Sequence, residues 1–484
     1  MRAKQKGDKM RSNYVKTNLK DVKEYGKRLF ANPKYKKSLF FLTDKERKLC
    51  EADSIPLAKN VSISLDSCFT KRNLNTIIFA DSKAGQYESV VLPTIKRANA
   101  SYVILDPGGR CFEDTAPRLM EQGYRVRRLN TADFSKSDGY NPLLYATCEA
   151  DVIELTEILY ERLLERDVSV HAKYVHLCLL RSAVFFLLEY CNEENEKNAD
   201  GSQNSRWTGH KTLQNVREFL AKDEECKDSL FDTLRKENAG SFAARYYDFF
   251  KDACSAKIRR QLTIELSIIL DPIGCTKDVT SKDEVNLSSL TQEKTAIFVE
   301  PHMADTSYDF LIGMLFTQAA GIVMKSEPEE RRKGPHVRLI MQDPERIGYI
   351  PNLNVFVAID RMFNASICAL YKSLPEAKAC LTDHSKCSDK FLFDSVDANC
   401  DIFIFLGSRE SATVEYAKNE WNRRMQKKRN RISMQDIAEM PAEKELLFAR
   451  GLPPVCVDKI REKYKKNCRC SDYTKNTPWF YSKK

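Results

Sequence analysis

The clearest structural signal in the chain is an apolar, β-branched run that stops at a turn, Asn75-Thr76-Ile77-Ile78-Phe79-Ala80 and then Asp81-Ser82-Lys83-Ala84-Gly85. A helical stretch follows from residue 88 towards residue 97. Another run, 101–105, ends at Asp106-Pro107-Gly108-Gly109, and a helix at 113–122 leads to a third run at 124–129. Uniformly apolar strands separated by helices are typical of a parallel sheet with right-handed crossovers. We therefore predict an α/β domain of the doubly wound type.

The middle of the chain has a helical pattern instead. Apolar residues recur there at i, i+3, i+4 and i+7, with no strand-like run between the segments 151–166, 173–190 and 257–270. Strand-like runs return afterwards at 294–299, 337–341 and 401–407, and helices are expected at 308–324, 353–363 and 410–420. One sheet interrupted by an all-helical insertion explains this order better than two sheets, because the first part offers few strands. The apolar segment 445–449 predicts an added edge strand.

Charge is distributed unevenly along the 484 residues, whose formal net charge is +10. Residues 1–50 hold 16 Lys and Arg against 5 Asp and Glu, and residues 421–484 hold 17 against 7, so the body between them is acidic. Basic ends favour contact with nucleic acid or an anionic membrane surface, and the plainer alternative is a solvated basic arm. The densest basic cluster offers the same two alternatives, with one aromatic residue for stacking on a base. It comprises Trp421, Arg423, Arg424, Lys427, Lys428, Arg429 and Arg431.

The cysteines and apolar stretches bear on location. Sixteen cysteines without a secretory signal or a C-x-x-C pair indicate reduced cytoplasmic thiols, and no metal site is expected. The longest apolar stretch, 310–324, is shorter than the roughly 20 residues of a membrane span. We therefore predict a cytoplasmic chain without a transmembrane helix, with peripheral contact at the inner face of the membrane as a further expectation.

The turn after residue 80 is where a parallel sheet of this kind binds an anion. A phosphate-binding loop requires G-x-x-x-x-G-K-[ST], in which the lysine neutralises phosphate and the hydroxyl holds Mg²⁺. This chain keeps the glycine at the sixth motif position, Gly85. The seventh and eighth positions carry an amide, Gln86, and a phenol, Tyr87, and the second position carries a carboxylate, Asp81. The eight positions are Ala80, Asp81, Ser82, Lys83, Ala84, Gly85, Gln86 and Tyr87. An active phosphate cradle is not expected, and Lys83 as a substitute cation is the alternative.

Several segments in a fixed order resemble a known family. They are 98–107 with its Asp-Pro, Gly123-Tyr124, Tyr140-Asn141-Pro142-Leu143, 343–353 with its Ile-Pro-Asn, and 399–407. Together they resemble the type IV secretion coupling proteins of the TraG/TraD kind, the conjugative DNA transfer family, from about residue 70 to about residue 455. The resemblance implies a RecA-like, P-loop NTPase-type parallel sheet with an inserted all-helical domain.

The resemblance also sets expectations for organisation and partners. Together with the charge pattern, it predicts a basic N-terminal arm at 1–70, a RecA-like domain in two parts at 71–149 and 281–424, an all-α insertion at 150–280 and a basic C-terminal segment at 425–484. The family hands a DNA–relaxase complex to a type IV secretion channel, usually as a ring of six. It uses ATP and Mg²⁺, and the ring here would be a homohexamer or a mixed hexamer with an active paralogue.

Departures from the family fall on its catalytic positions. The P-loop Lys and Thr fall on Gln86 and Tyr87, and the Walker B Asp-Glu pair falls on Gln342 and Asp343. A shifted alignment would use Asp343 and Glu345, although the proline between them disfavours regular strand geometry. A glutamine-rich segment of the family falls on 370–374, which contains no glutamine.

Three hypotheses follow from this pattern. The first is a coupling-protein fold with little or no ATPase activity that acts by binding. The second is an active ATP-driven DNA translocase that uses Lys83, Asp343 and Glu345 as replacements. The third is a degenerate protein without a retained role, which the intact apolar periodicities argue against.

Overall fold

The computed structural model describes residues 15–16, 53–70, 72–164, 168–190, 211–348, 350–381, 392–425 and 430–462. These residues fall into two compact units. The first comprises the described parts of 1–127, 287–300 and 319–473, and the second those of 128–286 and 301–318. The second unit is thus inserted in the sequence of the first.

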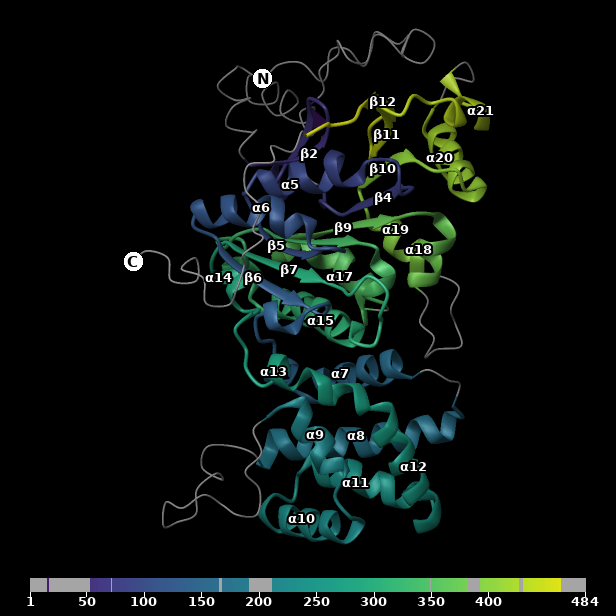
Figure 1. Ribbon diagram of the computed structural model, residues 1–484. Coiled ribbons are helices and arrows are strands. Elements are labelled where there is room, and N and C mark those ends of the chain that lie inside the picture. Colours follow the sequence, from purple (N-terminus) through teal and green to yellow (C-terminus); the bar gives the residue numbers. More distant parts are fainter. Residues whose placement is uncertain are drawn as a thin grey trace, which may run out of the picture. The chain divides into compact units, whose positions relative to one another are not determined.

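The first unit is built on a sheet of nine strands (Figure 1). Its order is β12-β11-β10-β4-β9-β8-β5-β7-β6. Every neighbouring pair from β10 to β7 is parallel, whereas β11 is antiparallel to both β10 and β12. The bounds are β4 Thr76–Ala80, β5 Ser101–Leu105, β6 Arg125–Asn130, β7 Thr295–Glu300, β8 Val337–Gln342, β9 Ala365–Tyr371, β10 Ile402–Gly407, β11 Lys444–Ala449 and β12 Val455–Asp458.

Two strands differ from the sequence-based expectation. The run at 445–449 forms β11, but β12 pairs with its outer side, so β11 is not the edge strand that the sequence predicted. Strand β9 was not predicted at all, and it lies between β4 and β8 with all seven residues buried. Its burial by neighbours on both sides compensates for a sequence rich in small residues.

Helices of the first unit connect the strands. The turn regions at the ends of β4, β5 and β8 lead directly into η2, α6 and η6. The helical segments are α4 Ser67–Thr70, η2 Tyr87–Val91, α5 Leu92–Lys96, α6 Arg110–Glu121, α14 Ser289–Gln292, α16 Pro328–Arg331, η6 Pro344–Arg346, α17 Leu353–Ile359, η7 Asp360–Phe363, α18 Leu374–Cys380, α19 Leu392–Ala398, α20 Ser411–Arg424 and α21 Met434–Ala438.

A small second sheet lies within the range expected as a basic arm. Its order is β1-β3-β2, with both pairs antiparallel, and its bounds are β1 Val15–Lys16, β2 Ser54–Ala58 and β3 Val61–Ser64. The remainder of residues 1–52 lies outside the described residues.

Aromatic side chains fill the core beside β4 and β10. Phe79 of β4 contacts four rings, among them Phe403 of β10 at 5.8 Å between centroids and Tyr416 of α20 at the same distance. Trp421 is fully buried, and its indole N–H donates to the Asn430 carbonyl at 3.0 Å. Trp421 is therefore a core residue, and the idea that it stacks on a nucleic-acid base is wrong.

The second unit is helical. Helix α8 packs against α7, α9, α11 and α12. The bounds are η3 Phe134–Lys136, η4 Pro142–Tyr145, α7 Glu149–Leu163, α8 Val170–Tyr190, α9 Leu213–Leu220, α10 Glu224–Glu237, α11 Phe242–Ala253, α12 Ala256–Ile269, η5 Asp271–Thr276 and α13 Lys277–Thr280. Helix α15, Asp309–Lys325, is divided between the two units after Gln318, and it contains the apolar stretch 310–324.

Within the described part of the chain, α8 alone is long and apolar enough to cross a membrane by length and composition. Of its most apolar window, 67% is buried. The helix also carries a buried polar contact, in which Tyr160 Oη lies 2.8 Å from His176 Nδ1. These features fit the core helix of a helical unit.

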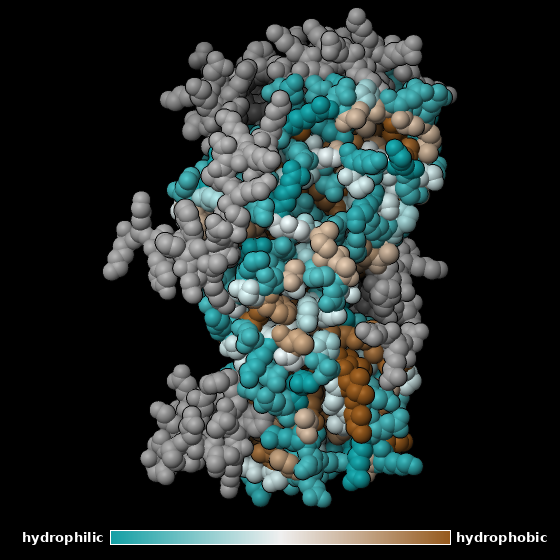
Figure 2. All heavy atoms as spheres, viewed as in Figure 1, coloured by the Kyte–Doolittle hydropathy of each residue, from teal (hydrophilic) through white to brown (hydrophobic). Residues whose placement is uncertain are grey.

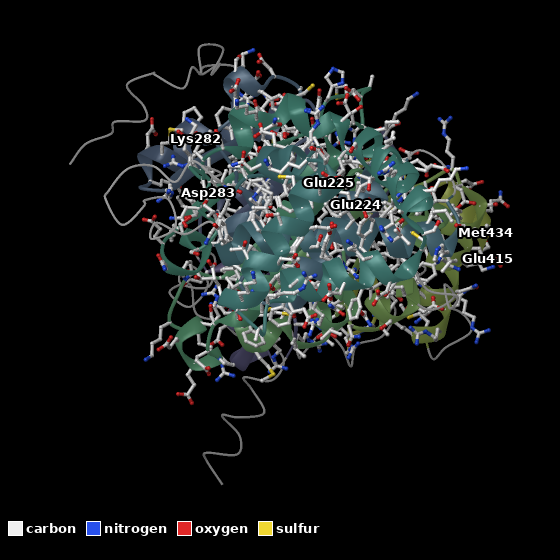
Figure 3. All side chains as sticks on the ribbon, turned by 90° about the horizontal axis from the view of Figure 1, so that it is seen from below. Glu224, Glu225, Lys282, Asp283, Glu415 and Met434 are labelled. Carbon is white, nitrogen blue, oxygen red and sulfur yellow. The ribbon has the colours of Figure 1, made fainter. Side chains whose placement is uncertain are left out.

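The surface of the helical unit combines charged and apolar residues. Figure 2 shows hydrophobic residues gathered on one part of it. The exposed large apolar side chains of the described residues include Ile258, Ile264 and Ile268 of α12. Figure 3 shows Glu224 and Glu225 beginning α10. Glu224 is paired with Arg259 of α12 at 2.7 Å, which links two helices of this unit.

Candidate nucleotide-binding site

The loop after β4 is held by hydrogen bonds within the loop and by one to the end of β10. The Asp81 N–H donates to the Gly407 carbonyl at 2.9 Å, and the Ala84 N–H donates to the Asp81 carbonyl at 3.0 Å. The Lys83 N–H donates to Asp81 Oδ1 at 2.9 Å, so a carboxylate of the chain itself accepts from this loop. Gly85 has φ of +76°, which favours glycine. Three N–H groups of the loop are thus already engaged by acceptors of the chain itself.

Tyr87 is anchored to α6. Its buried hydroxyl donates to Asp114 Oδ2 at 2.6 Å, and the Arg110 guanidinium lies 4.1 Å from the ring centroid. Arg110 is also paired with Glu88 at 2.9 Å. Burial is the main cause that raises the pKa of Tyr87 far above its usual value. The phenol therefore serves packing against α6.

The cation that the structure brings to this loop is Lys459, which follows β12. Its side chain is buried, and Nζ donates to the Ala84 carbonyl at 2.9 Å. Burial lowers the pKa of Lys459, while Glu445 and Asp81 oppose that shift. Lys83, the substitute cation suggested by the sequence, has an exposed side chain.

The end of β8 carries the three Walker B candidates. Gln342 is buried, and its Nε2 donates to the Leu105 carbonyl at 3.0 Å. Asp343 follows with φ of +50°, and Glu345 lies in η6. Lys372, immediately after β9, places Nζ 2.9 Å from both Asp343 Oδ1 and Glu345 Oε1. The parallel pairing of β8 and β9 brings these side chains to the same edge of the sheet.

A third carboxyl group completes this cluster. Burial, followed by a hydrogen bond with Glu345, raises the pKa of Glu376 to about 8. Burial alone would raise the pKa of Glu345 as well, but Glu376 and Lys372 lower it below its usual value. Burial would lower the pKa of Lys372, but its bonds to Glu345 and Asp343 raise it. The Lys372 ammonium therefore lies between the Asp343 and Glu345 carboxyl groups, and Glu376 is the weaker acid of the Glu345–Glu376 pair.

The N-terminus of α6 is also occupied by the chain itself. Asp106, after β5, accepts from the Cys111 N–H at 2.9 Å and the Phe112 N–H at 2.8 Å. Burial raises the pKa of Asp106 to about 6, although these hydrogen bonds oppose the shift. A Cβ on Gly109, whose φ is +69°, would lie 2.8 Å from Glu300 Oε1. This helix end is filled by side chains.

The structure thus assembles the predicted site residues at the carboxyl ends of β4 and β8, with β9 between them. Lys372 and Lys459 were not predicted as site residues. Lys372 lies in the segment 370–374, onto which the glutamine-rich segment of the family falls, and this is the sequence signal for it. Lys459 has no such signal. No group of three or more His, Cys, Asp and Glu that could hold a metal occurs among the residues with described positions.

Residues 66–396 match the family described as Type IV secretory system Conjugative DNA transfer, which is more than half of the chain. The chain belongs to this family. The curated relative VirD4 of Rhizobium radiobacter is 21% identical over 351 residues, which are 71% of this chain and 47% of VirD4. The chain therefore spans about half the length of this curated relative of the conjugative DNA transfer family.

Solved structures of conjugative coupling proteins share the fold. Unbound TrwBdeltaN70 has a TM-score of 0.61 at 11% identity, covering 87% of this chain and 91% of that one. TrwB in complex with ADP and Mg²⁺ has a TM-score of 0.57 at 11% identity, covering 81% and 87%. The predicted fold class, a P-loop NTPase-type sheet with an inserted helical domain, is confirmed, as is the predicted membership of the conjugative DNA transfer family.

Proposed function

We propose that this member of the conjugative DNA transfer family acts by binding, with little or no ATP hydrolysis. The observation that carries the proposal is Lys372, whose ammonium lies 2.9 Å from each of the two candidate carboxylates, Asp343 and Glu345. Mg²⁺ in an ATPase is held by oxygen ligands and waters that must be available to it. Here an internal cation neutralises those oxygens.

The phosphate side of the site supports the same proposal. Gln86 replaces the phosphate-binding lysine, and Tyr87 is bonded to Asp114 instead of offering a small hydroxyl to a metal. Asp81 adds a carboxylate to a loop in which the N–H groups of Asp81, Lys83 and Ala84 are already engaged. The residues present do not fit a Mg²⁺–nucleotide complex, so we derive no hydrolytic step for this site.

The partners we propose follow from the family and from the charge of the chain ends. They are DNA or a DNA–relaxase complex and type IV secretion channel proteins, met in a homohexamer or in a mixed hexamer with an active paralogue. The basic residues of 1–50 and 421–484 are suited to phosphate or to the inner face of the membrane. Most of them, including Lys427, Lys428 and Arg429, lie outside the described residues.

The first test measures turnover and metal binding on the full chain. We expect no Mg²⁺-dependent ATP hydrolysis above background. We also expect that electron paramagnetic resonance detects no bound Mn²⁺ at about 1 mM metal, a concentration at which even a weak site would be occupied. In Lys372→Gln, loss of the internal cation should let the carboxylates take up Mn²⁺ at least about tenfold more tightly. Lys333→Gln, which changes an exposed lysine of the same unit, should behave as the wild type.

One result would favour the alternative function. ATP hydrolysis by the wild type that disappears in Asp343→Asn and Glu345→Gln would identify an active translocase using these carboxylates, with Lys83 as the replacement cation. Oligonucleotide binding measured by fluorescence anisotropy on the same sample should weaken steeply with salt in either case. That assay therefore tests the binding role separately from turnover.

A further inference from the structure

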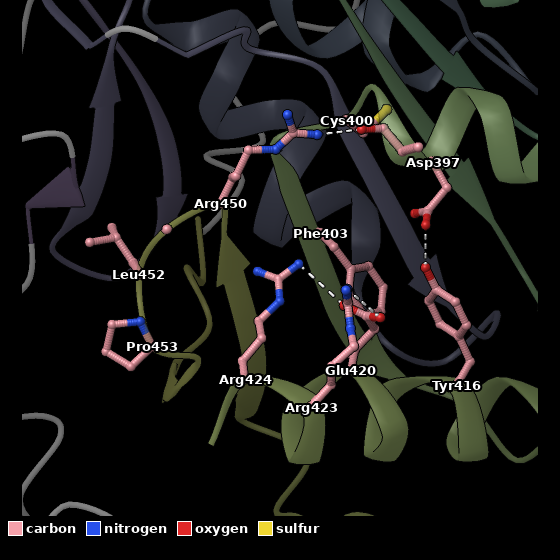
Figure 4. A pocket seen from close by; sticks show the side chains of 12 residues that line it. Asp397, Cys400, Phe403, Tyr416, Glu420, Arg423, Arg424, Arg450, Leu452 and Pro453 are labelled. Carbon is pink, nitrogen blue, oxygen red and sulfur yellow. Dashed lines mark hydrogen bonds and ion pairs between the residues drawn. The ribbon is translucent and has the colours of Figure 1, made fainter. Parts of the chain in front are cut away.

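A large basic cavity lies in the first unit, among residues that the nucleotide site does not use (Figure 4). Its volume is about 820 Å³, and it is bordered by α20, the end of α19, the start of β10 and the turn between β11 and β12. Three arginines line it: Arg423 and Arg424 from α20 and Arg450 from the turn. Leu452 and Pro453 add an apolar border.

The cavity already binds one carboxylate of the chain itself. Glu420 Oε2 lies 2.7 Å from Arg423 Nη2 and 3.2 Å from Arg424 Nη2 (Figure 4). Two guanidinium groups therefore share one carboxylate, which leaves an excess of positive charge. Arg423 is well placed for a ligand, because 69% of its side chain is exposed. These contacts show that the two arginines bind a carboxylate.

A second cavity adjoins the first at the turn. Its volume is about 430 Å³, and the two cavities share Arg450 and Gly451. Gly451 has φ of +72°, and a Cβ there would lie 3.2 Å from Arg72 Nη2, so a glycine is needed where the turn passes this arginine. The second cavity adds Arg72 and Arg361 to the arginines that line the first. The arginine-lined surface therefore extends across both cavities.

The acidic groups of the two cavities are fewer than the arginines. Besides Glu420 they are Asp397, which accepts from the Tyr416 hydroxyl at 2.7 Å, and Asp401, which is paired with Arg450 at 2.6 Å. Burial raises the pKa of Asp397, which weakens its share of negative charge. Five arginines against three carboxyl groups favour an anionic ligand.

The size of the cavities and the packing of their aromatic rings distinguish between classes of anionic ligand. Single-stranded nucleic acid binds through aromatic faces on which bases stack. The rings of this cavity, Phe403 and Tyr416, are instead packed against each other at 5.4 Å and against Phe79. Duplex DNA is too wide to enter a concavity of this size. An extended peptide in which acidic and apolar residues alternate presents carboxylates to the arginines and apolar side chains to Leu452 and Pro453.

We propose that these two adjoining cavities bind an acidic peptide segment of a partner protein, with its carboxylates on Arg423, Arg424 and Arg450 and its chain continuing towards Arg361. This site is independent of the nucleotide site and of whether ATP is hydrolysed. It places protein recognition on the part of the sheet around the start of β10.

The test uses the full chain and two fluorescein-labelled probes of equal net charge, a short peptide alternating Glu and Leu and an oligothymidylate. Binding is followed by fluorescence anisotropy. Arg423→Glu should weaken peptide binding about tenfold, because it replaces an attraction by a repulsion. Arg361→Glu should weaken it by a similar factor. Oligothymidylate binding, to which the basic chain ends contribute in every variant, should remain within about twofold.

Arg332→Glu is the matched control, because it makes the same charge change at an exposed arginine of the same unit and should leave both affinities unchanged. Equal peptide affinity in the wild type and Arg423→Glu would overturn the proposal, as would the absence of peptide binding. An equal loss of oligothymidylate binding would instead identify a nucleic-acid surface. Unaltered peptide binding in Arg361→Glu would overturn the extension into the second cavity.

Discussion

Replacing Arg338 by Met is expected to lower the free energy of unfolding by about 4 kcal/mol, the range found when one partner of a buried charged network is removed. Arg338 of β8 is 1% exposed, and its guanidinium donates to the Leu74 carbonyl at 3.1 Å, Ser366 Oγ at 3.0 Å and Thr76 Oγ1 at 3.2 Å. It also lowers the pKa of the buried Asp360, which burial raises strongly. Methionine fills similar space but removes all three of these donated hydrogen bonds, so the Leu74 carbonyl keeps the Thr76 hydroxyl and Ser366 Oγ keeps its contact with His336 Nε2. Asp360 also loses a nearby positive charge.

Urea-induced unfolding followed by circular dichroism measures this effect. Arg332→Met is the control, because the Arg332 side chain is exposed at the end of α16, and it should change the free energy of unfolding by less than about 0.5 kcal/mol. An unfolding midpoint of Arg338→Met equal to that of the wild type would contradict the role given to this network.

Acidification from pH 6.5 to about pH 4 is expected to remove about 3 kcal/mol of stability through His336. Burial lowers the pKa of His336 to about 3, with smaller contributions from Arg338 and Arg331, although the hydrogen bond with Asn364 opposes the shift. Between pH 6.5 and about 3, the unfolded chain takes up a proton that the folded chain does not. The free energy of unfolding therefore falls as the pH is lowered, by about 1.4 kcal/mol per pH unit.

The measurement compares the wild type with His336→Gln at both pH values. Glutamine retains one donor and one acceptor for Asn364 Oδ1 and Ser366 Oγ, which lie 3.0 and 2.8 Å from the ring nitrogens. Asp106, whose pKa of about 6 gives the opposite dependence, contributes equally to both proteins. The variant should thus lose about 3 kcal/mol less on acidification, and an equal loss in the two proteins would rule out His336 as the cause.

Most strands of the sheet could be predicted from the sequence because each is an apolar run between turn residues. Strands β4, β5, β7, β8 and β10 begin within a residue of the predicted runs. Strand β9 was missed because Ala365, Ser366 and Ala369 carry little strand preference, and its burial by β4 and β8 compensates for this. The position of β12 outside β11 depends on tertiary pairing, which local patterns do not reveal.

The chemistry of the candidate site could be predicted less completely than its location. The unsuitable residue types at Gln86 and Tyr87 are visible in the sequence itself. Their new contacts are not, because Asp114 lies on another helix and Lys459 reaches the loop from 375 residues away. The contacts of Lys372 with Asp343 and Glu345 depend on β8 and β9 being neighbours in the sheet, which the missed strand concealed.

The contacts of Lys372 with Asp343 and Glu345 also limit which substitutions the site tolerates. Under the proposed binding role, a change to a hydrolytic site would require new residues at positions 86, 87, 342 and 372, of which Tyr87, Gln342 and Lys372 now contact neighbours in other elements. Removing Lys372 alone brings Asp343 and Glu345 into uncompensated repulsion, and replacing Gln342 alone strips the Leu105 carbonyl of its donor. Each of these two single changes is therefore expected to destabilise the chain. Gln342 and Lys372 are thereby tied to their present neighbours, the end of β5 and the segment from Asp343 to Glu345.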